Sequence, residues 1–231
     1  MTEHIVKSYE DELNALGAAC ARLGGLAEAQ LGDAVDAIVR RDPALATKVL
    51  QQDDRLDEIE ADVEQKAIRL IALRQPMAND LRKTMAAMKI ASNLERCGDL
   101  AKNIAKRTLV LSEIEPMPAL NRSIERMGRL VETRLKEVLD AYISNDAERA
   151  MEVWRRDEEV DEHYNSLFRE LLTYMMGDPR TITACAHLLF VAKNLERIGD
   201  HATNIAEIVH YEITGEQVSS ADRPRADDLR A

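Results

Sequence analysis

Apolar residues recur at three- and four-residue spacing along six long segments of the chain, and a few turn residues separate these segments. In the second segment, Val49, Leu56, Val63 and Leu70 recur every seven residues, which places them on one helix face. This spacing predicts one α-helix per segment, and the short connections make neighbouring helices antiparallel. The predicted helices span residues 5–41, 43–74, 77–112, 118–144, 146–176 and 179–214.

The predicted helix ends carry recognisable capping residues. Asp42 followed by Pro43 is typical of a helix N-cap with proline at the first helical position. Asn145-Asp146 predicts a break between two helices, and Thr214-Gly215 predicts a C-cap. Residues 217–231 lack periodic apolar residues, and we predict that they form a disordered tail.

The chain contains an internal duplication. The peptides 93–105 and 194–206 share the pattern Glu-x3-Asp-x3-Asn. Upstream of each motif lies a second pair of similar segments, residues 36–42 and residues 140–146. Residues 53–58 match 157–162 in the same order. We therefore predict an all-α protein of two tandem three-helix bundles, with the first domain at residues 5–114 and the second at residues 118–216.

Composition limits the class of protein. The 231 residues are 45% hydrophobic, 32% charged and only 3% aromatic, which favours long helices around an aliphatic core. The net charge of −11 argues against a nucleic-acid partner, because phosphate backbones attract basic surfaces. Three scattered cysteines without zinc-site spacing fit a reducing compartment. With neither a signal peptide nor a membrane-length apolar run in the sequence, we expect a soluble cytoplasmic protein without membrane insertion.

Acidic pairs at four-residue spacing mark two helices of each repeat. Four residues correspond to about 40° around a helix, so both acids of a pair share one face. Asp57 precedes the turn at Pro76 by as many residues as Glu95 follows it, so we expect these two acids to lie at the same height. The four pairs are Asp53 with Asp57, Glu95 with Asp99, Asp157 with Asp161, and Glu196 with Asp200.

Clustered carboxylates resist ionisation unless a cation compensates them, and oxygen-only clusters suit hard cations. The pairs therefore indicate a metal site in each bundle. The same pairs also fit a solvated helix face with local partners such as Arg96 and Arg197. Gly98 and Gly199 lie inside the motifs, where glycine costs helix stability, so we expect a neighbouring helix or ligand to approach closely there.

Three functional classes remain open at this point: a metal-binding regulator, a carboxylate-bridged metalloenzyme with hydrolytic or redox chemistry, and a metal-free helical adaptor. Glu207-x2-His210 is the only Glu-x2-His motif in the sequence, whereas ferritin-like di-iron sites use two. No phosphate-binding loop, dinucleotide turn or nucleophile–base arrangement is recognisable. We expect no catalytic residues and therefore no enzyme.

The runs 76–82, 93–99 and 194–204, together with Thr214-Gly215-Glu216, resemble the PhoU family of phosphate-transport regulators. The resemblance covers residues 5–216. It implies two three-helix bundles with divalent or trivalent metal ions, iron or zinc in multinuclear clusters in some members. The implied ligands are Asp53, Asp57, Glu95, Asp99, Asp157, Asp161, Glu196 and Asp200, with Asn103 and Asn204 as additional candidates.

The same resemblance implies a cytoplasmic negative regulator of phosphate uptake and of the phosphate-starvation response, often a homodimer. Its implied partners are the ATPase of a phosphate ABC transporter and a sensor histidine kinase. The two repeats differ at one position of the motif, where Leu100 stands in the first repeat and His201 in the second. Cys97 also replaces the usual apolar residue, so the two sites are expected to differ in affinity.

Overall fold

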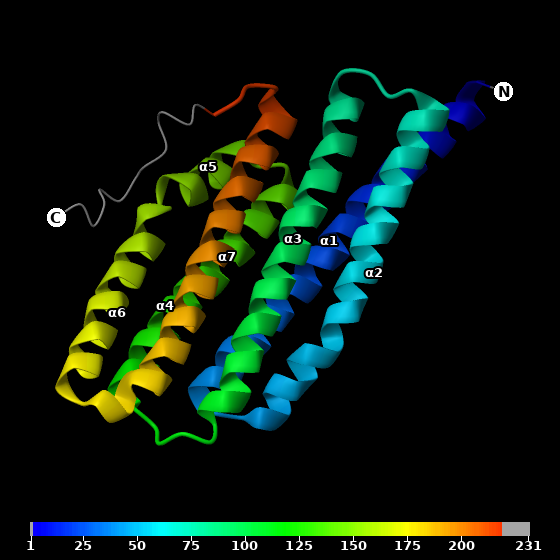
Figure 1. Ribbon diagram of the computed structural model, residues 1–231. Helices are drawn as coiled ribbons and strands as arrows, with labels where there is room; N and C mark the ends of the chain where they lie inside the picture. The colour runs from blue at the N-terminus through cyan, green and yellow to red at the C-terminus, as the bar shows by residue number, and fades with distance from the viewer. Residues whose placement is uncertain (1, 219–231) are drawn as a thin grey trace.

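The computed structural model describes residues 2–218, without the side chains of residues 2–8 and Asp53. The described residues form helices and connecting turns, with no strand among them (Figure 1). Most of the predicted tail, residues 219–231, lies outside the described residues. The elements are α1 (Thr2–Arg40), α2 (Pro43–Arg74), α3 (Asn79–Leu111), α4 (Pro118–Ser144), α5 (Ala147–Arg155), α6 (Glu158–Gly177), the 3₁₀ turn η1 (Pro179–Thr181) and α7 (Ile182–Thr214).

The predicted all-α class is confirmed, but the segment predicted as one helix over residues 146–176 is two helices, α5 and α6. Between them, backbone hydrogen bonds join residues three apart instead of four: the backbone N–H of Asp157 donates to the carbonyl oxygen of Trp154 at 3.3 Å. Side chains of α4 hold both sides of this break: Glu137 accepts from Arg156 at 2.7 Å, and Arg134 donates to Glu159. These ion pairs stabilise a break that the apolar spacing of the segment does not reveal.

The predicted helix ends have a clear structural basis. The Asp42 carboxylate accepts from the backbone N–H groups of Ala44 and Leu45 at 2.9 and 3.0 Å, which satisfies two free donors at the start of α2. Asp146 caps α5 in the same way, accepting from the Arg149 N–H at 3.0 Å. Gly215 ends α7 with a φ of 78°, a left-handed conformation that glycine adopts at low cost.

The two repeats form two adjacent bundles that share one core. Helices α1, α2 and α3 pack on one another, and α4 to α7 form the second group, with α5 and α6 together covering α7 (Figure 1). The groups meet where α3 packs against α7 and α1 against α4. Buried aliphatic residues of both repeats form one continuous cluster, so the two bundles are fused rather than separate.

Arg41 secures the connection between the repeats. Its guanidinium donates to the carbonyl oxygens of Leu111 at 2.6 Å and Ser112 at 3.3 Å, and to the carbonyl of Ile114. These carbonyls lie at the end of α3 and in the turn that follows it, where carbonyl groups lack the next helical turn as a hydrogen-bond partner. Among the described residues, no helix is long and apolar enough to cross a membrane.

Candidate carboxylate site

In the first repeat, the structure brings the acids of α2 and α3 into electrostatic contact. Burial raises the pKa of Glu95, the Asp99 charge raises it further, and Asp57 and Glu60 add to the effect from α2 while Arg96 opposes it. Asp57 thus influences Glu95 electrostatically across the two antiparallel helices, which agrees with the similar height expected from the sequence. The carboxylates repel one another, and a bound cation would relieve that repulsion.

Glu60 was missed in the sequence analysis. It lies one turn after Asp57 on α2, and its pKa is raised by burial and then by Glu64 and Asp57. Its three-residue spacing from Asp57 was a usable signal, because residues three apart also share a helix face. Arg96 partly neutralises the negative charge of these acids, because its guanidinium lies 3.5 Å from the Glu95 carboxylate and 3.7 Å from the Asp99 carboxylate.

In the second repeat, the corresponding acids make specific hydrogen bonds. Asp157, at the break before α6, accepts from the Thr203 hydroxyl of α7 at 2.6 Å. Glu196 uses one carboxylate oxygen to pair with Lys193 at 2.6 Å, while its Oε2 is buried and has no hydrogen-bond partner among the described residues. An unsatisfied buried carboxylate oxygen is costly, and a cation would satisfy it. Asp161 and Asp200 are half-buried.

The remaining predicted ligands are Asp53, Asn103 and Asn204. The Asp53 side chain lies outside the described residues, Asn103 is exposed and Asn204 is half-buried. Among the described side chains, no three acidic, histidine or cysteine residues lie close enough together to hold a metal ion. The donor chemistry of both acidic groups nevertheless fits a hard cation, and the ligand assignment stays a prediction.

Gly98 and Gly199 are sites of close helix approach, as the sequence predicted. A Cβ atom on Gly98 would lie 2.6 Å from Leu56 Cδ2 and 3.1 Å from the Gln30 Oε1 atom. At Gly199 a Cβ would lie 3.1 Å from Val160 Cγ1. The glycines therefore let the acid-bearing helices α2 and α6 pack directly against α3 and α7.

The two motif helices also contact each other. His201 of α7 lies 2.9 Å from the Asn93 side-chain oxygen of α3, so the position that differs between the repeats links them. Burial lowers the pKa of His201, and the charges of Arg197 and Arg96 lower it further.

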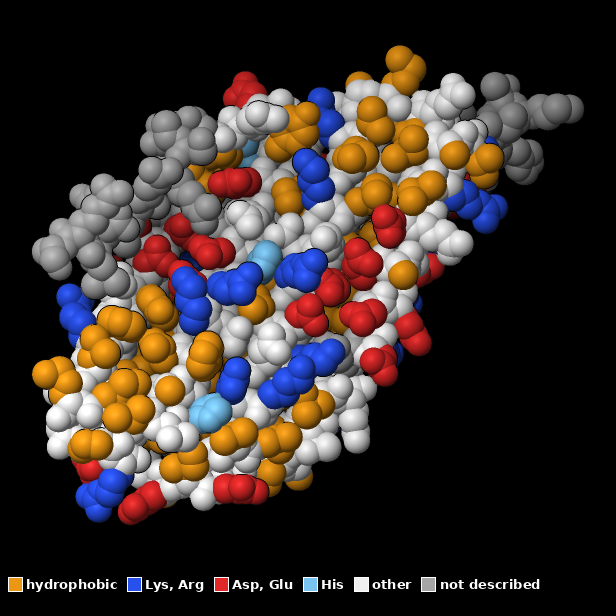
Figure 2. All heavy atoms as spheres, in the orientation of Figure 1, with side chains coloured by type: hydrophobic (Ala, Val, Ile, Leu, Met, Phe, Trp, Pro, Cys, Tyr) orange, Lys and Arg blue, Asp and Glu red, His pale blue; other side chains and the backbone are white. Residues whose placement is uncertain are grey.

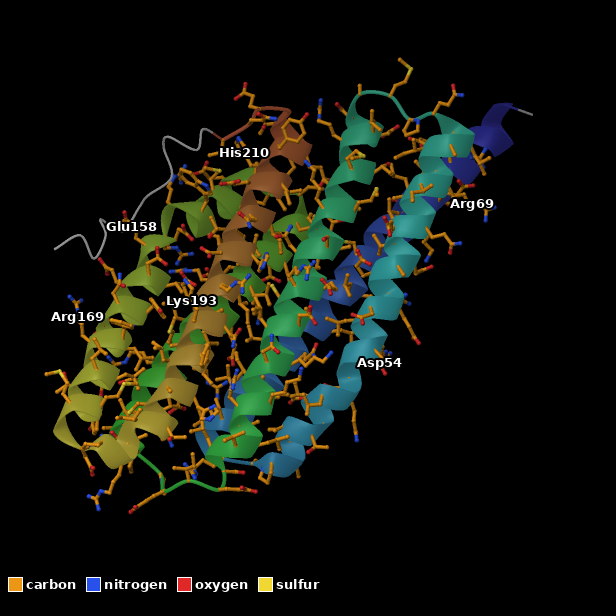
Figure 3. All side chains as sticks on the ribbon, in the orientation of Figure 1. Asp54, Arg69, Glu158, Arg169, Lys193 and His210 are labelled. Carbon is orange, nitrogen blue, oxygen red and sulfur yellow. The ribbon has the colours of Figure 1, made fainter. Side chains whose placement is uncertain are left out.

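Charged side chains gather along this joint in two groups. Figure 2 shows basic side chains on the joint between α3 and α7, with acidic ones beside them over α2 and α3. Lys193 projects from the middle of α7 (Figure 3), and its ammonium also lies 5.2 Å from the centre of the Tyr164 ring of α6. Basic and acidic groups thus alternate across this face rather than forming one uniform patch.

Comparison with known proteins extends this picture over the whole chain. The family model of the PhoU domain matches residues 20–108 and 124–209, one match per repeat. A protein of Caulobacter vibrioides called "Phosphate-specific transport system accessory protein PhoU homolog" is 66% identical over 229 residues, 99% of each chain. A Rhizobium meliloti protein of the same name is 51% identical over 97% of this chain and 94% of its own.

Solved structures give the same relationship. The crystal structure of PhoU from Pseudomonas aeruginosa matches with a TM-score of 0.88 at 38% identity, over 90% of this chain and all of that one. The phosphate transport system regulatory protein PhoU of Streptococcus pneumoniae matches with a TM-score of 0.84 at 30% identity, over 91% and 99% of the chains. Two family matches, full-length sequence identity and a common fold agree that this chain belongs to the PhoU family.

Proposed function

We propose that this protein is a cytoplasmic, non-enzymatic accessory protein that restrains phosphate uptake and the phosphate-starvation response. The observation that carries this proposal is the end-to-end match, 99% of both chains, to a phosphate-specific transport system accessory protein. The protein would act by contact with the ATPase of a phosphate transporter and with a sensor histidine kinase. The homodimer implied by the sequence resemblance stays a prediction.

Two exposed apolar surfaces suit contacts of this kind. The tip of the α2–α3 hairpin exposes Leu73, Met77 and Leu81, and the tip of the α6–α7 hairpin exposes Met176 and Ile182. Figure 2 shows apolar side chains gathered at both ends of this face. Large exposed apolar groups in one patch typically mark an interaction surface. We assign one tip to each of the two partners because the duplicated fold presents the surface twice.

The contact proposal predicts a regulatory defect without unfolding. In a strain whose own copy is deleted, Met77→Glu with Leu81→Glu should release a phosphate-starvation reporter in high phosphate to about the level of the deletion. A buried charge at an interface typically costs several kcal/mol of binding free energy. The measurement is reporter activity, together with thermal unfolding of the purified variant.

Val110→Glu is the matched control, since Val110 is also an exposed apolar residue of α3 but lies at the opposite end of the helix from the α2–α3 tip. This variant should keep the reporter repressed. Full repression by the tip variant would contradict the contact surface, and repression in the deletion strain itself would contradict the regulatory function.

We also propose that the acidic pairs bind metal ions. In the first repeat Asp53, Asp57, Glu95 and Asp99 would hold the cation, and in the second Asp157, Asp161, Glu196 and Asp200 would, with Asn103 and Asn204 at the edges. The raised pKa of Glu95 and the unpartnered Oε2 of Glu196 support this proposal. The cation would neutralise the carboxylates and hold neighbouring helices together.

Removing two of the ligands should lower the metal content. Glu95→Ala with Asp99→Ala is expected to lose the metal of the first repeat, roughly half of the total, because the remaining α2 acids cannot complete a coordination shell. Elemental analysis of the purified protein measures this. Glu148→Ala, which changes an exposed acid of α5, should retain all the metal. Unchanged metal in the double variant would refute the ligand assignment and favour a metal-free adaptor.

A further inference from the structure

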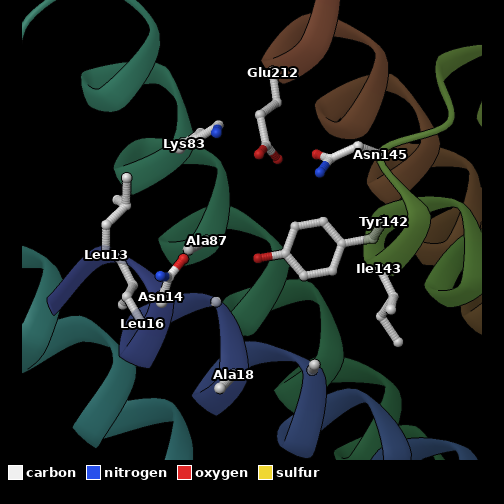
Figure 4. A pocket seen from close by; sticks show the side chains of 12 residues that line it. Leu13, Asn14, Leu16, Ala18, Lys83, Ala87, Tyr142, Ile143, Asn145 and Glu212 are labelled. Atoms are coloured by element: carbon white, nitrogen blue, oxygen red, sulfur yellow. The ribbon is translucent and has the colours of Figure 1, made fainter. Parts of the chain in front are cut away.

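A cavity of about 340 Å³ opens where α1, α3, α4 and the end of α7 meet (Figure 4). It is separate from the acidic pairs, since Glu212 in its wall follows Asp200 by 12 residues, about 18 Å along α7. Binding sites for small molecules begin at about 300 Å³, so the cavity can hold a small ligand.

Glu212 is the unusual residue of this cavity. Glu212 is only 8% exposed, and its Oε2 atom has no hydrogen-bond partner in the described part of the chain. A carboxyl oxygen buried in this way loses its hydration without a replacement, which favours any ligand that brings a donor or a positive charge. The apolar stripe of α7 would ordinarily place an aliphatic residue at this position.

Lys83 supplies the opposite charge on the same cavity. It is an exposed residue of α3, and its charge lowers the pKa of Glu212, which shows that the two groups influence each other. The carboxyl oxygen is nevertheless unpartnered, so Lys83 does not bond to it. Figure 4 shows Glu212 and Lys83 extending from different helices towards the same opening, with the Asn145 carboxamide beside Glu212.

The rest of the wall is partly aliphatic and partly polar, with Asn14 and Tyr142 among its residues, and the Tyr142 hydroxyl points into the opening (Figure 4). Leu13 and Leu16 of α1 lie on one side and Ile143 of α4 on the other (Figure 4). A simple cation would satisfy Glu212 but be repelled by Lys83, and a simple anion would have the reverse problem. A small zwitterion with an aliphatic body satisfies both charges and the wall.

We propose that this cavity binds a small aliphatic α-amino acid, with its ammonium group on Glu212, its carboxylate towards Lys83 and its side chain between Leu13, Leu16 and Ile143. Such a site lies outside the phosphate-regulating role proposed above. It gives the protein a second, independent ligand.

The test uses the full-length protein at pH 7.5, titrated with L-leucine, L-valine and L-alanine and followed by calorimetry and by NMR of the backbone amides. Leucine is expected to bind saturably and to shift amides around the cavity. 3-Methylbutylamine and 4-methylpentanoate carry the same aliphatic body with only one of the two charges. Each should bind about tenfold or more weakly, because a charged hydrogen-bond partner is lost.

Two variants separate the charges. Glu212→Gln keeps the shape of the side chain and should weaken leucine about tenfold, because the partner of the ammonium group is lost. It should strengthen 4-methylpentanoate, because the repulsion between its carboxylate and Glu212 is removed. Lys83→Met should weaken leucine and 4-methylpentanoate but not the amine, and Lys89→Met on the same helix is the control without effect. The proposal is overturned if no amino acid shifts amides around the cavity, or if the amine alone binds as tightly as leucine. Should Glu212→Gln fail to fold, the analogue series with the unaltered chain decides the question.

Discussion

Replacing Glu212 with glutamine should stabilise the protein at pH 8 and have little effect on stability near pH 5. Burial raises the pKa of this carboxyl group to about 7, with Lys83 opposing the shift. As the pH rises, the unfolded state releases this proton near pH 4.5, the ordinary glutamate pKa, whereas the folded state keeps it until about pH 7. The stability due to this proton is fully present below about pH 4.5 and is lost as the pH rises through 7.

The difference of about 2.5 pKa units corresponds to about 3 kcal/mol at most, and we expect about 2 kcal/mol because the cavity admits water. The groups that face Glu212 do not share this titration. Burial raises the pKa of Cys20 on α1 to about 12 and also raises the pKa of Tyr142 on α4, so both groups stay neutral between pH 5 and 8. Lys83, Asn14 and Asn145 are the other polar residues that line the cavity together with Glu212 and Tyr142.

Urea unfolding at pH 5, 6, 7 and 8 measures this effect as the difference between variant and unaltered protein, which cancels the contributions of other acids. Glu148→Gln is the control, because the side chain of Glu148 is 72% exposed and its replacement should give no pH-dependent difference. A constant difference between Glu212→Gln and the unaltered protein across these pH values would show that Glu212 is ionised in the folded protein throughout.

Local signals in the sequence were sufficient to predict the helices and their ends. Periodic apolar residues fix which face of a helix is buried, and capping residues such as Asp42 and Gly215 act within one turn. The electrostatic influence of Asp57 on Glu95 was also predictable, since a short turn between antiparallel helices sets which residues lie at the same height. Every one of these features depends on sequence neighbours or on one hairpin.

Features that depend on distant residues were not predictable in the same way. The break between α5 and α6 is held by Arg134 and Glu137 of another helix, so the helical periodicity continues through it. The joint of α3 with α7, including the contact of Asn93 with His201, requires knowledge of how the repeats pack. Glu212 did leave a signal, an acid on the apolar stripe that includes Ile205 and Val209, which an inspection of charged residues on buried faces would have found.

Gly98→Ala should destabilise the protein by about 1–3 kcal/mol, although alanine is otherwise the better helix former by about 1 kcal/mol. The new Cβ would lie 2.6 Å from Cδ2 of Leu56, so this side chain, which is only 2% exposed and lies in the core, would have to shift. The same atom would lie 3.1 Å from the amide oxygen of Gln30. Because α2 carries Asp57, forcing α2 away from α3 should also weaken metal binding in the first repeat, if metal binds there.

A double-mutant cycle with Leu56→Ala isolates the cause in urea unfolding. Leu56→Ala alone should cost about 2–5 kcal/mol as a large-to-small core substitution. In the Gly98→Ala background it should cost at least about 1 kcal/mol less, because it also removes the overlap. Gly25→Ala is the control, since Gly25 is exposed and no atom lies within 4 Å of its added Cβ, so this change should stabilise. Additive effects of Gly98→Ala and Leu56→Ala would mean that close packing of α2 on α3 is not the reason for the glycine.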